Sequence, residues 1–498
     1  MDKNRQRKLM LNSITSFLNQ IITLVCGFIL PKMILSSFGS SINGLVTSIN
    51  QFLNVITFLD LGVGAVVTSE LYRPLAEKDS DKISAIFVAA QSFFRKIALI
   101  FIVYISVLLF VYPTYVTADY GFWFVSSLIL SISITLFSQY YFGIVYQLLL
   151  NADQSTYIVM VVQSVTLVIN TIASIVLIKV GMSIQIVKLS TSVIFLARPI
   201  ILGAYVKRKY QINRRIQYTG NPIKQKWNGL AQHAASVVLN NTDTIVLTMF
   251  STLENVSVYG VYNLVVNGMR TLCSSFTAGI SALFGNMIAR NENELLNQTF
   301  DHFEWLIHTA ITLLFTICAI LIVPFVQVYT LGIEDANYIA PLFGVMIVLA
   351  QGIYCIRLPY NMMVLAAGHY KETQLSSIIE MMINIVISII MVNKYGLVGV
   401  AIGTLAAMLY RTIYLAWYLS HNIINRKIIL FIKHVLIDLL SIICIVFATR
   451  WICLGVLSYF NWIIMAIKVG IISLVISLLI NIIFYRDNTI QMINKYKK

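Results

Sequence analysis

The chain has 498 residues, of which 58% are hydrophobic and only 11% are charged, whereas about 25% of a typical soluble domain is charged. A soluble protein of this size would have too little polar surface to cover itself. The composition therefore excludes a cytosolic enzyme, a secreted disulfide scaffold and a disordered chain. We expect a polytopic α-helical membrane protein with little mass outside the bilayer.

Fourteen apolar runs, separated by polar loops, follow one another along the chain. A membrane-spanning helix needs about 20 such residues. The runs cover approximately 10–36, 42–70, 83–112, 121–150, 156–178, 183–206, 228–251, 258–289, 303–330, 339–366, 374–393, 397–420, 434–449 and 462–485. They predict an all-α fold with about 14 transmembrane helices.

The net charge of +15 is explained by the distribution of lysine and arginine over the loops. With the N-terminus in the cytoplasm, the cytoplasmic segments hold 23 of these residues and the outer loops hold 3, namely Lys179, Lys394 and Arg450. This bias follows the positive-inside rule and predicts that both termini are cytoplasmic. The basic balance therefore requires no nucleic acid as a partner, and anionic lipid headgroups suit the cytoplasmic clusters.

The sequence repeats itself at a common offset. INGLVTSINQF (42–52) aligns with VYGVYNLVVNG (258–268) at an offset of 216, and LLLNADQSTYI (148–158) aligns with AAGHYKETQL (366–375) at an offset near 217. Such an offset spans six helices, so the repeat is parallel and favours a substrate cavity between its two halves. We predict a six-helix lobe at 1–206, a basic cytoplasmic linker at 207–226, a second six-helix lobe at 227–425, and two added helices with a basic tail at 426–498.

No enzymatic, metal-binding or cofactor motif is present. The sequence lacks HExxH, GxSxG and Walker A patterns, which would supply a metalloprotease, hydrolase or nucleotide site. The six cysteines form no CxxC pair, and we expect none of the six histidines to form a metal pair with carboxylates, so we interpret the cysteines and His308 as packing residues. We therefore expect neither catalysis nor a cofactor nor a metal.

Charged residues inside the apolar runs are the most informative, because a charge at the bilayer centre usually faces a cavity or a partner. Guanidinium groups bind phosphate bidentately and stay charged at depth, so deep arginines favour an anionic, phosphorylated substrate. The candidate substrate-binding residues are Arg270, Arg357, Lys32, Arg411, Arg198, Asn240 and Asn267. The candidate coupling residues or counter-charges are Asp60, Asp243, Glu304 and Glu380.

A purely structural interpretation of these residues is open as well. Each cation can pair with an acid that joins two helices, or can extend its side chain to the membrane surface. The amides of Asn240 and Asn267 need hydrogen-bond partners in hydrocarbon, and these partners can belong to a hydrated cavity or to a neighbouring helix.

Four blocks in the same order along both lobes carry a family resemblance. They are FLDLGVGAVVTSELYRPLAEKD (58–79), NNTDTIVLTMFSTLENVSVYGVYN (240–263), IRLPYNMMVLAAGHYKET (356–373) and INIVISIIMVNKYGLVGVAIGT (383–404). In these blocks the chain resembles the Wzx-type polysaccharide flippases of the multidrug/oligosaccharidyl-lipid/polysaccharide (MOP) exporter superfamily. The resemblance covers nearly the whole chain.

The resemblance implies two MATE-like lobes that rock around a central site. The implied substrate is an undecaprenyl-diphosphate-linked oligosaccharide, moved from the inner to the outer leaflet of a bacterial plasma membrane for capsule, exopolysaccharide or O-antigen assembly. The implied partners are this lipid-linked substrate, the membrane lipids, a polysaccharide polymerase, and chain-length or export machinery. The energy source stays open between a membrane potential and an ion gradient.

Three other functions compete with this one. A lipid II flippase would also have fourteen spans and a cationic cavity, but with more arginines in its first span, where this chain has Lys32 as the only deep cation. A multidrug cation antiporter would lack the last pair of helices and favour acidic cavity residues. A membrane-embedded glycosyltransferase or polymerase would need large loops with catalytic groups, whereas the outer loops near 331–338 and 450–461 are short and poor in charge.

Overall fold

The computed structural model describes residues 3–60, 62–116, 120–216, 230–277, 280–424, 426–486 and 488. Helices cover almost all of these residues and none of them lies in a strand, which confirms the predicted all-α class. Within this part of the chain, 11 helices are long and apolar enough to cross a membrane. The number of fourteen spans stays a prediction, and residues 217–226 of the predicted linker and most of the basic tail lie outside the described residues.

The chain divides into two compact units, Met1–Ser257 and Val258–Lys498. The lobe and linker boundaries inferred from the repeat stay predictions. The elements of the first unit are α1 (Lys3–Asn54), η1 (Val55–Asp60), α2 (Val63–Glu77), α3 (Ser80–Val111), α4 (Pro113–Val116), α5 (Phe122–Ser138), η2 (Gln139–Gly143), α6 (Ile144–Ala152), α7 (Thr156–Lys179), α8 (Ile184–Lys209) and α9 (Leu230–Phe250).

The 52 residues of α1 form two helices that join at a kink. Gly39 adopts φ 85° and ψ 174° there, a conformation that residues with a side chain rarely adopt. At 1.5 Å per residue, 52 residues of helix would measure about 78 Å, more than twice the ~30 Å hydrocarbon core. The predicted spans 10–36 and 42–70 lie on either side of this glycine.

Helix packing in the first unit combines apolar contacts with hydrogen bonds between helices. α7 packs against α1, and α8 packs against both α5 and α7. α1 also contacts α9, where the hydroxyls of Ser48 and Thr248 are 2.7 Å apart. The Tyr112 hydroxyl at the end of α3 donates to Ser48 at 2.8 Å. Such bonds satisfy polar groups that hydrocarbon cannot.

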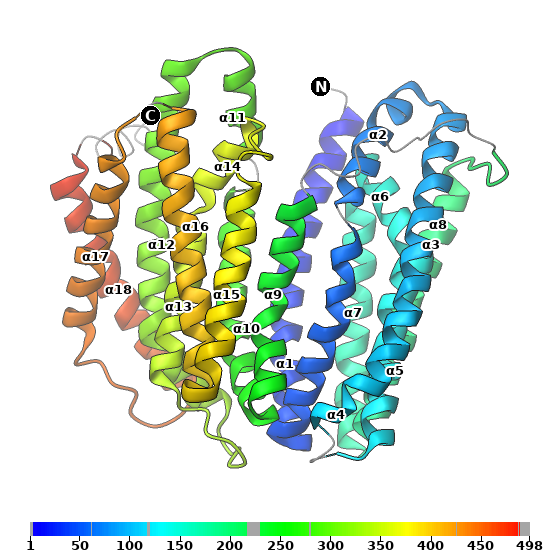
Figure 1. The fold of residues 1–498 in the computed structure, drawn as a ribbon, viewed down its shortest axis with the longest axis horizontal. Coiled ribbons are helices and arrows are strands. Elements are labelled where there is room, and N and C mark those ends of the chain that lie inside the picture. Colours follow the sequence, from blue (N-terminus) through cyan, green and yellow to red (C-terminus); the bar gives the residue numbers. More distant parts are fainter. Residues whose placement is uncertain are drawn as a thin grey trace. The chain divides into compact units, whose positions relative to one another are not determined.

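The second unit is built around two long helices, α12 and α16, each of which packs against several neighbours (Figure 1). α12 packs against α13, α17 and α18, and α16 packs against α13 and α15. The last two helices, α17 and α18, also pack against each other. The helices of this unit are α10 (Leu253–Thr277, which begins in the first unit), α11 (Ile280–Ala289), α12 (Asn293–Tyr329), α13 (Pro341–Ile356), α14 (Leu358–Ala366), α15 (Gln374–Tyr395), α16 (Leu397–Asn422), α17 (Ile429–Thr449) and α18 (Tyr459–Phe484).

The order of the helices repeats between the units. In the first unit, the five-residue π-helix η2, which begins at Gln139, separates α5 from α6. In the second unit, the break between α13 and α14 falls at Arg357, 218 residues later. The next helix begins at Thr156 in the first unit and at Gln374 in the second. π-segments and helix breaks frequently mark functional sites, so the break at Arg357 directs attention to this residue.

Large apolar side chains are exposed along the spans, as a membrane protein requires. Phe110 of α3 is 73% exposed and Ile483 of α18 is 70% exposed. Contiguous apolar surfaces of this kind are rare on soluble monomers. The chain is therefore a multi-pass helical membrane protein.

Candidate functional site

Arg357 lies at the break between α13 and α14, where the local sequence ends one helix and begins the next. Pro359, in the first turn of α14, has no backbone N–H to donate. The Arg357 side chain is almost fully buried and donates a hydrogen bond from Nη1 to Oε1 of Glu380 on α15. Because an unpaired buried charge is costly, this ion pair explains how an arginine is held at depth.

A second buried arginine, Arg411 of α16, faces the same carboxylate. Its Nε lies 3.8 Å from Oε2 of Glu380. Its Nη1 donates to the carbonyl oxygen of Thr373 at 2.9 Å and to the hydroxyl of Ser376. Glu380 therefore lies between two arginines, and the three side chains join the α13–α14 break to α15 and α16.

A third arginine completes the cluster through an aromatic ring. The guanidinium carbon of Arg270, on α10, lies 3.9 Å from the centre of the Tyr354 ring, and that of Arg357 lies 4.7 Å from the same centre. Cation–π contacts of this kind stabilise a guanidinium group while its N–H edges stay directed elsewhere. We name Arg270, Tyr354, Arg357, Glu380 and Arg411 the arginine cluster; its ionised side chains carry three positive charges and one negative charge.

The structure thus brings together four of the predicted site residues, namely Arg270, Arg357, Arg411 and Glu380. Asn267 is exposed on α10, one helical turn before Arg270. Helix positions three residues apart lie on the same face. Asn267 is therefore placed beside the cluster on its own helix.

The other predicted residues, except Glu304 of α12, belong to the first unit. Arg198 of α8 donates from Nε to the Thr166 hydroxyl at 2.8 Å, and its guanidinium carbon lies 3.7 Å from the centre of the Phe195 ring. Asp60 of η1 accepts a hydrogen bond from the Tyr140 hydroxyl at 3.1 Å. The remaining ones are the half-buried Lys32 on α1, and the exposed Asn240 and buried Asp243 on α9. Their roles in substrate binding or coupling stay predictions.

A second polar cluster in the second unit contains one predicted counter-charge, Glu304, but its other members were not predicted from the sequence. Glu304 and His308 on α12 lie near His434 and Asp438 on α17, and Arg426 reaches Glu304 from the segment between α16 and α17. Both helices carry their two polar residues at a spacing of four inside an apolar run, which places each pair on one helix face. That spacing was the available signal. In the described part of the chain, no group of three His, Cys, Asp or Glu is placed to hold a metal ion.

An apolar cavity of about 750 Å³ lies among α12, α13, α16 and α17. Asp438 is the one charged residue among those that line it. The lining is otherwise formed by threonine, glycine and apolar residues, namely Ile311, Thr312, Phe315, Thr316, Ala319, Ile320, Val345, Leu349, Gly352, Ile353, Ile356, Leu409, Thr412, Ile413, Phe431, Ile432, Val435, Leu436, Leu439, Ile442 and Val446.

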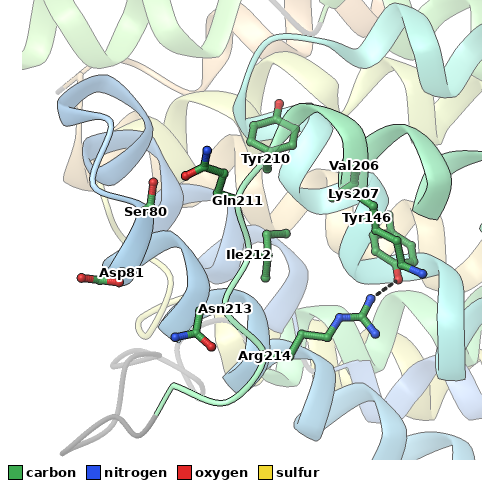
Figure 2. A pocket seen from close by; sticks show the side chains of 10 residues that line it. All are labelled: Ser80, Asp81, Tyr146, Val206, Lys207, Tyr210, Gln211, Ile212, Asn213 and Arg214. Atoms are coloured by element: carbon green, nitrogen blue, oxygen red, sulfur yellow. Dashed lines mark hydrogen bonds between the residues drawn. The ribbon is translucent and has the colours of Figure 1, made fainter.

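A smaller, polar cavity of about 540 Å³ lies in the first unit, where the start of α3 meets the segment that follows α8. Figure 2 shows Arg214 reaching Tyr146, to whose hydroxyl its Nη2 donates at 3.1 Å. Lys207 also lines this cavity. Both cations belong to the predicted cytoplasmic linker, so this cavity fits the charge bias of the loops rather than a site at membrane depth.

Comparison with known proteins identifies the fold. No protein-family model and no curated protein matches the chain. Among solved structures, the chain is similar to a lipid II flippase, MurJ, in an inward closed conformation, with a TM-score of 0.69 and 16% identity over 96% of this chain and 99% of that one. The chain and this flippase share a fold.

Two MATE transporters share this fold. A MATE family multidrug resistance transporter of the MOP superfamily, in its inward-facing conformation, has a TM-score of 0.60 and 15% identity over 80% of this chain and 95% of that one. A MATE transporter from Vibrio cholerae in a bent form has a TM-score of 0.55 and 14% identity over 88% of this chain and 99% of that one. At these identities the likeness concerns the fold, and the resemblance to the Wzx type stays a prediction.

Proposed function

We propose that the chain is a flippase for a lipid-linked oligosaccharide, in which a diphosphate joins the sugar to a polyprenyl carrier. In this proposal it moves the substrate from the inner to the outer leaflet of a bacterial plasma membrane by alternating access, with both termini in the cytoplasm. The product then serves a polysaccharide polymerase and its chain-length or export machinery in capsule, exopolysaccharide or O-antigen assembly.

The observation that carries this proposal is the arginine cluster. Arg270 and Arg357 both contact Tyr354, while Glu380 faces Arg357 and Arg411. A diphosphate is a compact anion, and the planar guanidinium group binds phosphate oxygens with two parallel hydrogen bonds. Three arginines with one glutamate suit an anionic headgroup and disfavour the lipophilic cation of a drug antiporter.

The apolar cavity supports the lipid part of the substrate. It measures about 750 Å³, and threonine, glycine and apolar side chains from four helices form nearly all of its lining. Hydrocarbon makes the same dispersion contacts with such a lining as it makes with lipid tails, so a polyprenyl chain can occupy the cavity without loss. A substrate with an anionic headgroup and a hydrocarbon tail therefore matches both features of the second unit.

A lipid II flippase is the second candidate, because a structure of that function, MurJ, matches 96% of this chain with a TM-score of 0.69. Lipid II shares the polyprenyl diphosphate, so the arginine cluster and the apolar cavity suit both substrates. The two candidates differ in the sugar. Deletion of the gene, followed by analysis of accumulated lipid-linked intermediates, separates them: polysaccharide repeat units support the first candidate, and lipid II supports the second.

The headgroup assignment is tested with variants of Arg270 and Arg357 in the deletion strain. We expect Arg270→Ala to lower surface polysaccharide strongly, Arg270→Lys to retain part of the export, and the double alanine variant to abolish it. Lys394→Ala, which removes an exposed cation at the end of α15, is the matched control. All variants are compared at equal membrane expression, and normal export by the double alanine variant would overturn the assignment.

A further inference from the structure

A continuous set of polar side chains joins α12, α14, α17, α18 and the segment before α17 in the second unit. α12, α17 and α18 pack against one another, and α14 contacts α12 (Figure 1). The members that lie fully inside the protein are Glu304, His308, Tyr360, His434 and Asp438. Polar groups buried at this depth cost several kcal/mol unless they are hydrogen-bonded. The hydrogen bonds between the members of this set meet that requirement.

Glu304 is the fixed negative charge of this set. Arg426 holds it with both terminal nitrogens, from Nη1 to Oε2 at 2.5 Å and from Nη2 to Oε1. The Tyr360 hydroxyl donates to Oε1 at 2.6 Å. Because an arginine holds both carboxylate oxygens, Glu304 stays ionised, and the only proton of the Tyr360 hydroxyl is committed to it.

That commitment fixes the protons on His308. Its Nε2 lies 2.9 Å from the Tyr360 oxygen, so Nε2 carries a hydrogen and donates it. Its Nδ1 lies 2.6 Å from Oδ2 of Asp438. A contact of this length needs a proton, on Nδ1 or on Oδ2, because a bare nitrogen lone pair would repel the carboxylate. The His308–Asp438 pair is neutral with this proton and carries one negative charge without it.

His434 is placed to exchange a proton in the same set. Its Nδ1 lies 2.6 Å from the Tyr485 hydroxyl and its Nε2 lies 3.5 Å from Oε2 of Glu304. As a neutral ring it accepts from Tyr485, and as a cation it donates to the same oxygen, so both forms keep their hydrogen bond. Its ring stacks on His308 with centres 4.9 Å apart, and two positive imidazoles at this distance would repel each other.

The two ends of the set face different surroundings. At one end, the half-exposed Asp301 accepts from Arg426 at 2.8 Å. At the other end, Asp438 lines the apolar cavity. The exposed Lys433 is a further charged group near the set, and its Nζ lies 5.5 Å from the centre of the Tyr485 ring. α11 and α13, which also pack against α12, contain no Asp, Glu, Lys, Arg or His within their bounds.

We propose that the His308–Asp438 pair, with His434 beside it, is a proton-binding site that couples proton binding to occupation of the apolar cavity by a polyprenyl chain. With its proton the pair is neutral, and hydrocarbon packs against Asp438 at little cost. Without the proton, a negative charge borders the cavity, and hydrocarbon would remove its hydration. Linkage then requires the chain and the proton to favour each other's binding. This inference rests on the proposed function for its ligand, but its proton site is tested separately.

The proton site is tested on the purified full chain in lipid nanodiscs by ¹⁵N NMR of its six histidines between pH 5 and pH 9. We expect the wild-type chain to release one proton per molecule from this site as the pH rises. Asp438→Asn and His308→Gln should abolish this step, and His434→Gln should shift it. His421→Gln, which alters an exposed histidine on α16, is the control. A wild-type titration curve in the first two variants would overturn the proton site.

The coupling is tested by measuring the affinity of undecaprenyl phosphate, as the probe, across the same pH range. We expect the affinity of the wild-type chain to fall by up to about tenfold per pH unit where the pair loses its proton, and that of Asp438→Asn to be independent of pH. A pH-independent affinity in the wild-type chain would overturn the coupling. If the export assay contradicts the flippase assignment while the histidine titration and the pH-dependent affinity are both observed as expected, the proposed function is refuted. The proton site then still stands.

Discussion

Arg270 and Arg357 lie against the same aromatic ring, that of Tyr354, although 87 residues separate them in the chain. The two guanidinium groups can both lie against this ring because the carboxylate of Glu380 offsets the positive charge of Arg357. The second arginine on this carboxylate, Arg411, makes Glu380 the residue on which the charge balance of the site depends.

Replacement of Glu380 by glutamine should therefore destabilise the second unit. The change leaves two buried arginines without their counter-charge, and breaking a buried ion pair by removing one partner costs about 3–5 kcal/mol. Thermal unfolding in detergent, followed by size-exclusion chromatography, should show a lower Tm. Glu334→Gln, an exposed glutamate between α12 and α13, should leave the Tm unchanged, and an unaltered Tm for Glu380→Gln would contradict the structural role of the cluster.

The Arg357→Gln, Glu380→Gln double variant refines the same test. Removing both members of the pair leaves only Arg411 to be compensated, so we expect the double variant to be more stable than Glu380→Gln alone. The interaction energy in this double-mutant cycle measures the pair itself. An additive cycle would show that the two side chains do not interact in the folded protein.

A second prediction concerns Gly44 in α1, where α1 approaches the start of α10. A Cβ at this position would collide with the backbone carbonyl group of Leu253, and a backbone group cannot move aside as a side chain can. Gly44→Ala should therefore cost about 1–3 kcal/mol of stability, the usual range for overpacking.

Gly285 of α11 provides the matched control. A Cβ there would meet nothing within 4 Å, so Gly285→Ala should be neutral or stabilising by about 0.5–1 kcal/mol, as alanine is in a helix interior. Equal unfolding temperatures for the two alanine variants would show that α1 and α10 do not approach each other at Gly44.

The helices could be predicted from the sequence because apolar runs of membrane length leave the backbone no alternative to helix. Breaks inside a run were not predictable in the same way. Gly39, which divides α1 through its positive φ, falls between the predicted runs 10–36 and 42–70. Arg357, at the break between α13 and α14, lies inside the predicted run 339–366, where an arginine does not by itself reveal how the chain bends.

The position of a charged residue within an apolar run predicted some of the site residues but not others. Counting residues from the start of a run selected Arg270 and Arg357, which the structure places together. The sequence predicts a packing role for His308, whereas the structure pairs it with Asp438, 130 residues away on another helix. The rotation of one helix against another decides such a contact, and no local pattern in the sequence records it.

A third prediction concerns the pH dependence of stability through Asp153, in the turn between α6 and α7. Its Oδ2 accepts from Lys209 at 2.5 Å, from Tyr210 at 2.7 Å and from Lys8 at 3.2 Å, which joins this turn to α1 and α8. Burial raises the pKa of the Asp153 carboxyl, but the hydrogen bonds from Lys209 and Tyr210 outweigh burial and hold the pKa below its ordinary value.

A carboxyl whose pKa falls on folding stabilises the protein above its unfolded pKa of about 3.9, and this contribution is lost as the pH falls through the lower folded pKa. Asp153→Asn should therefore lower stability at pH 7 by about 2 kcal/mol and lose part of the acid sensitivity below pH ~4. Unfolding temperatures at pH 7 and pH 3.5 measure both effects. Glu372→Gln, at an exposed position before α15, should change neither, and a wild-type acid profile for Asp153→Asn would refute the prediction.

The last prediction tests whether the apolar cavity takes up the lipid tail of the substrate. Leu349 of α13 and Ile413 of α16 both line the cavity, so tryptophan at either position would occupy space that a polyprenyl chain needs. The steric overlap between the indole ring and the chain costs about 1–3 kcal/mol, so export should fall roughly tenfold or more. Leu479→Trp is the control, because Leu479 is half-exposed on α18 and is not among the residues that line the cavity. Surface polysaccharide is measured for each variant and normalised to its membrane expression. A variant that exports less but keeps the wild-type unfolding temperature has a blocked cavity rather than a misfolded chain. Full export by both cavity variants would place the lipid tail outside this cavity and leave the arginine cluster as the only support for a lipid-linked substrate.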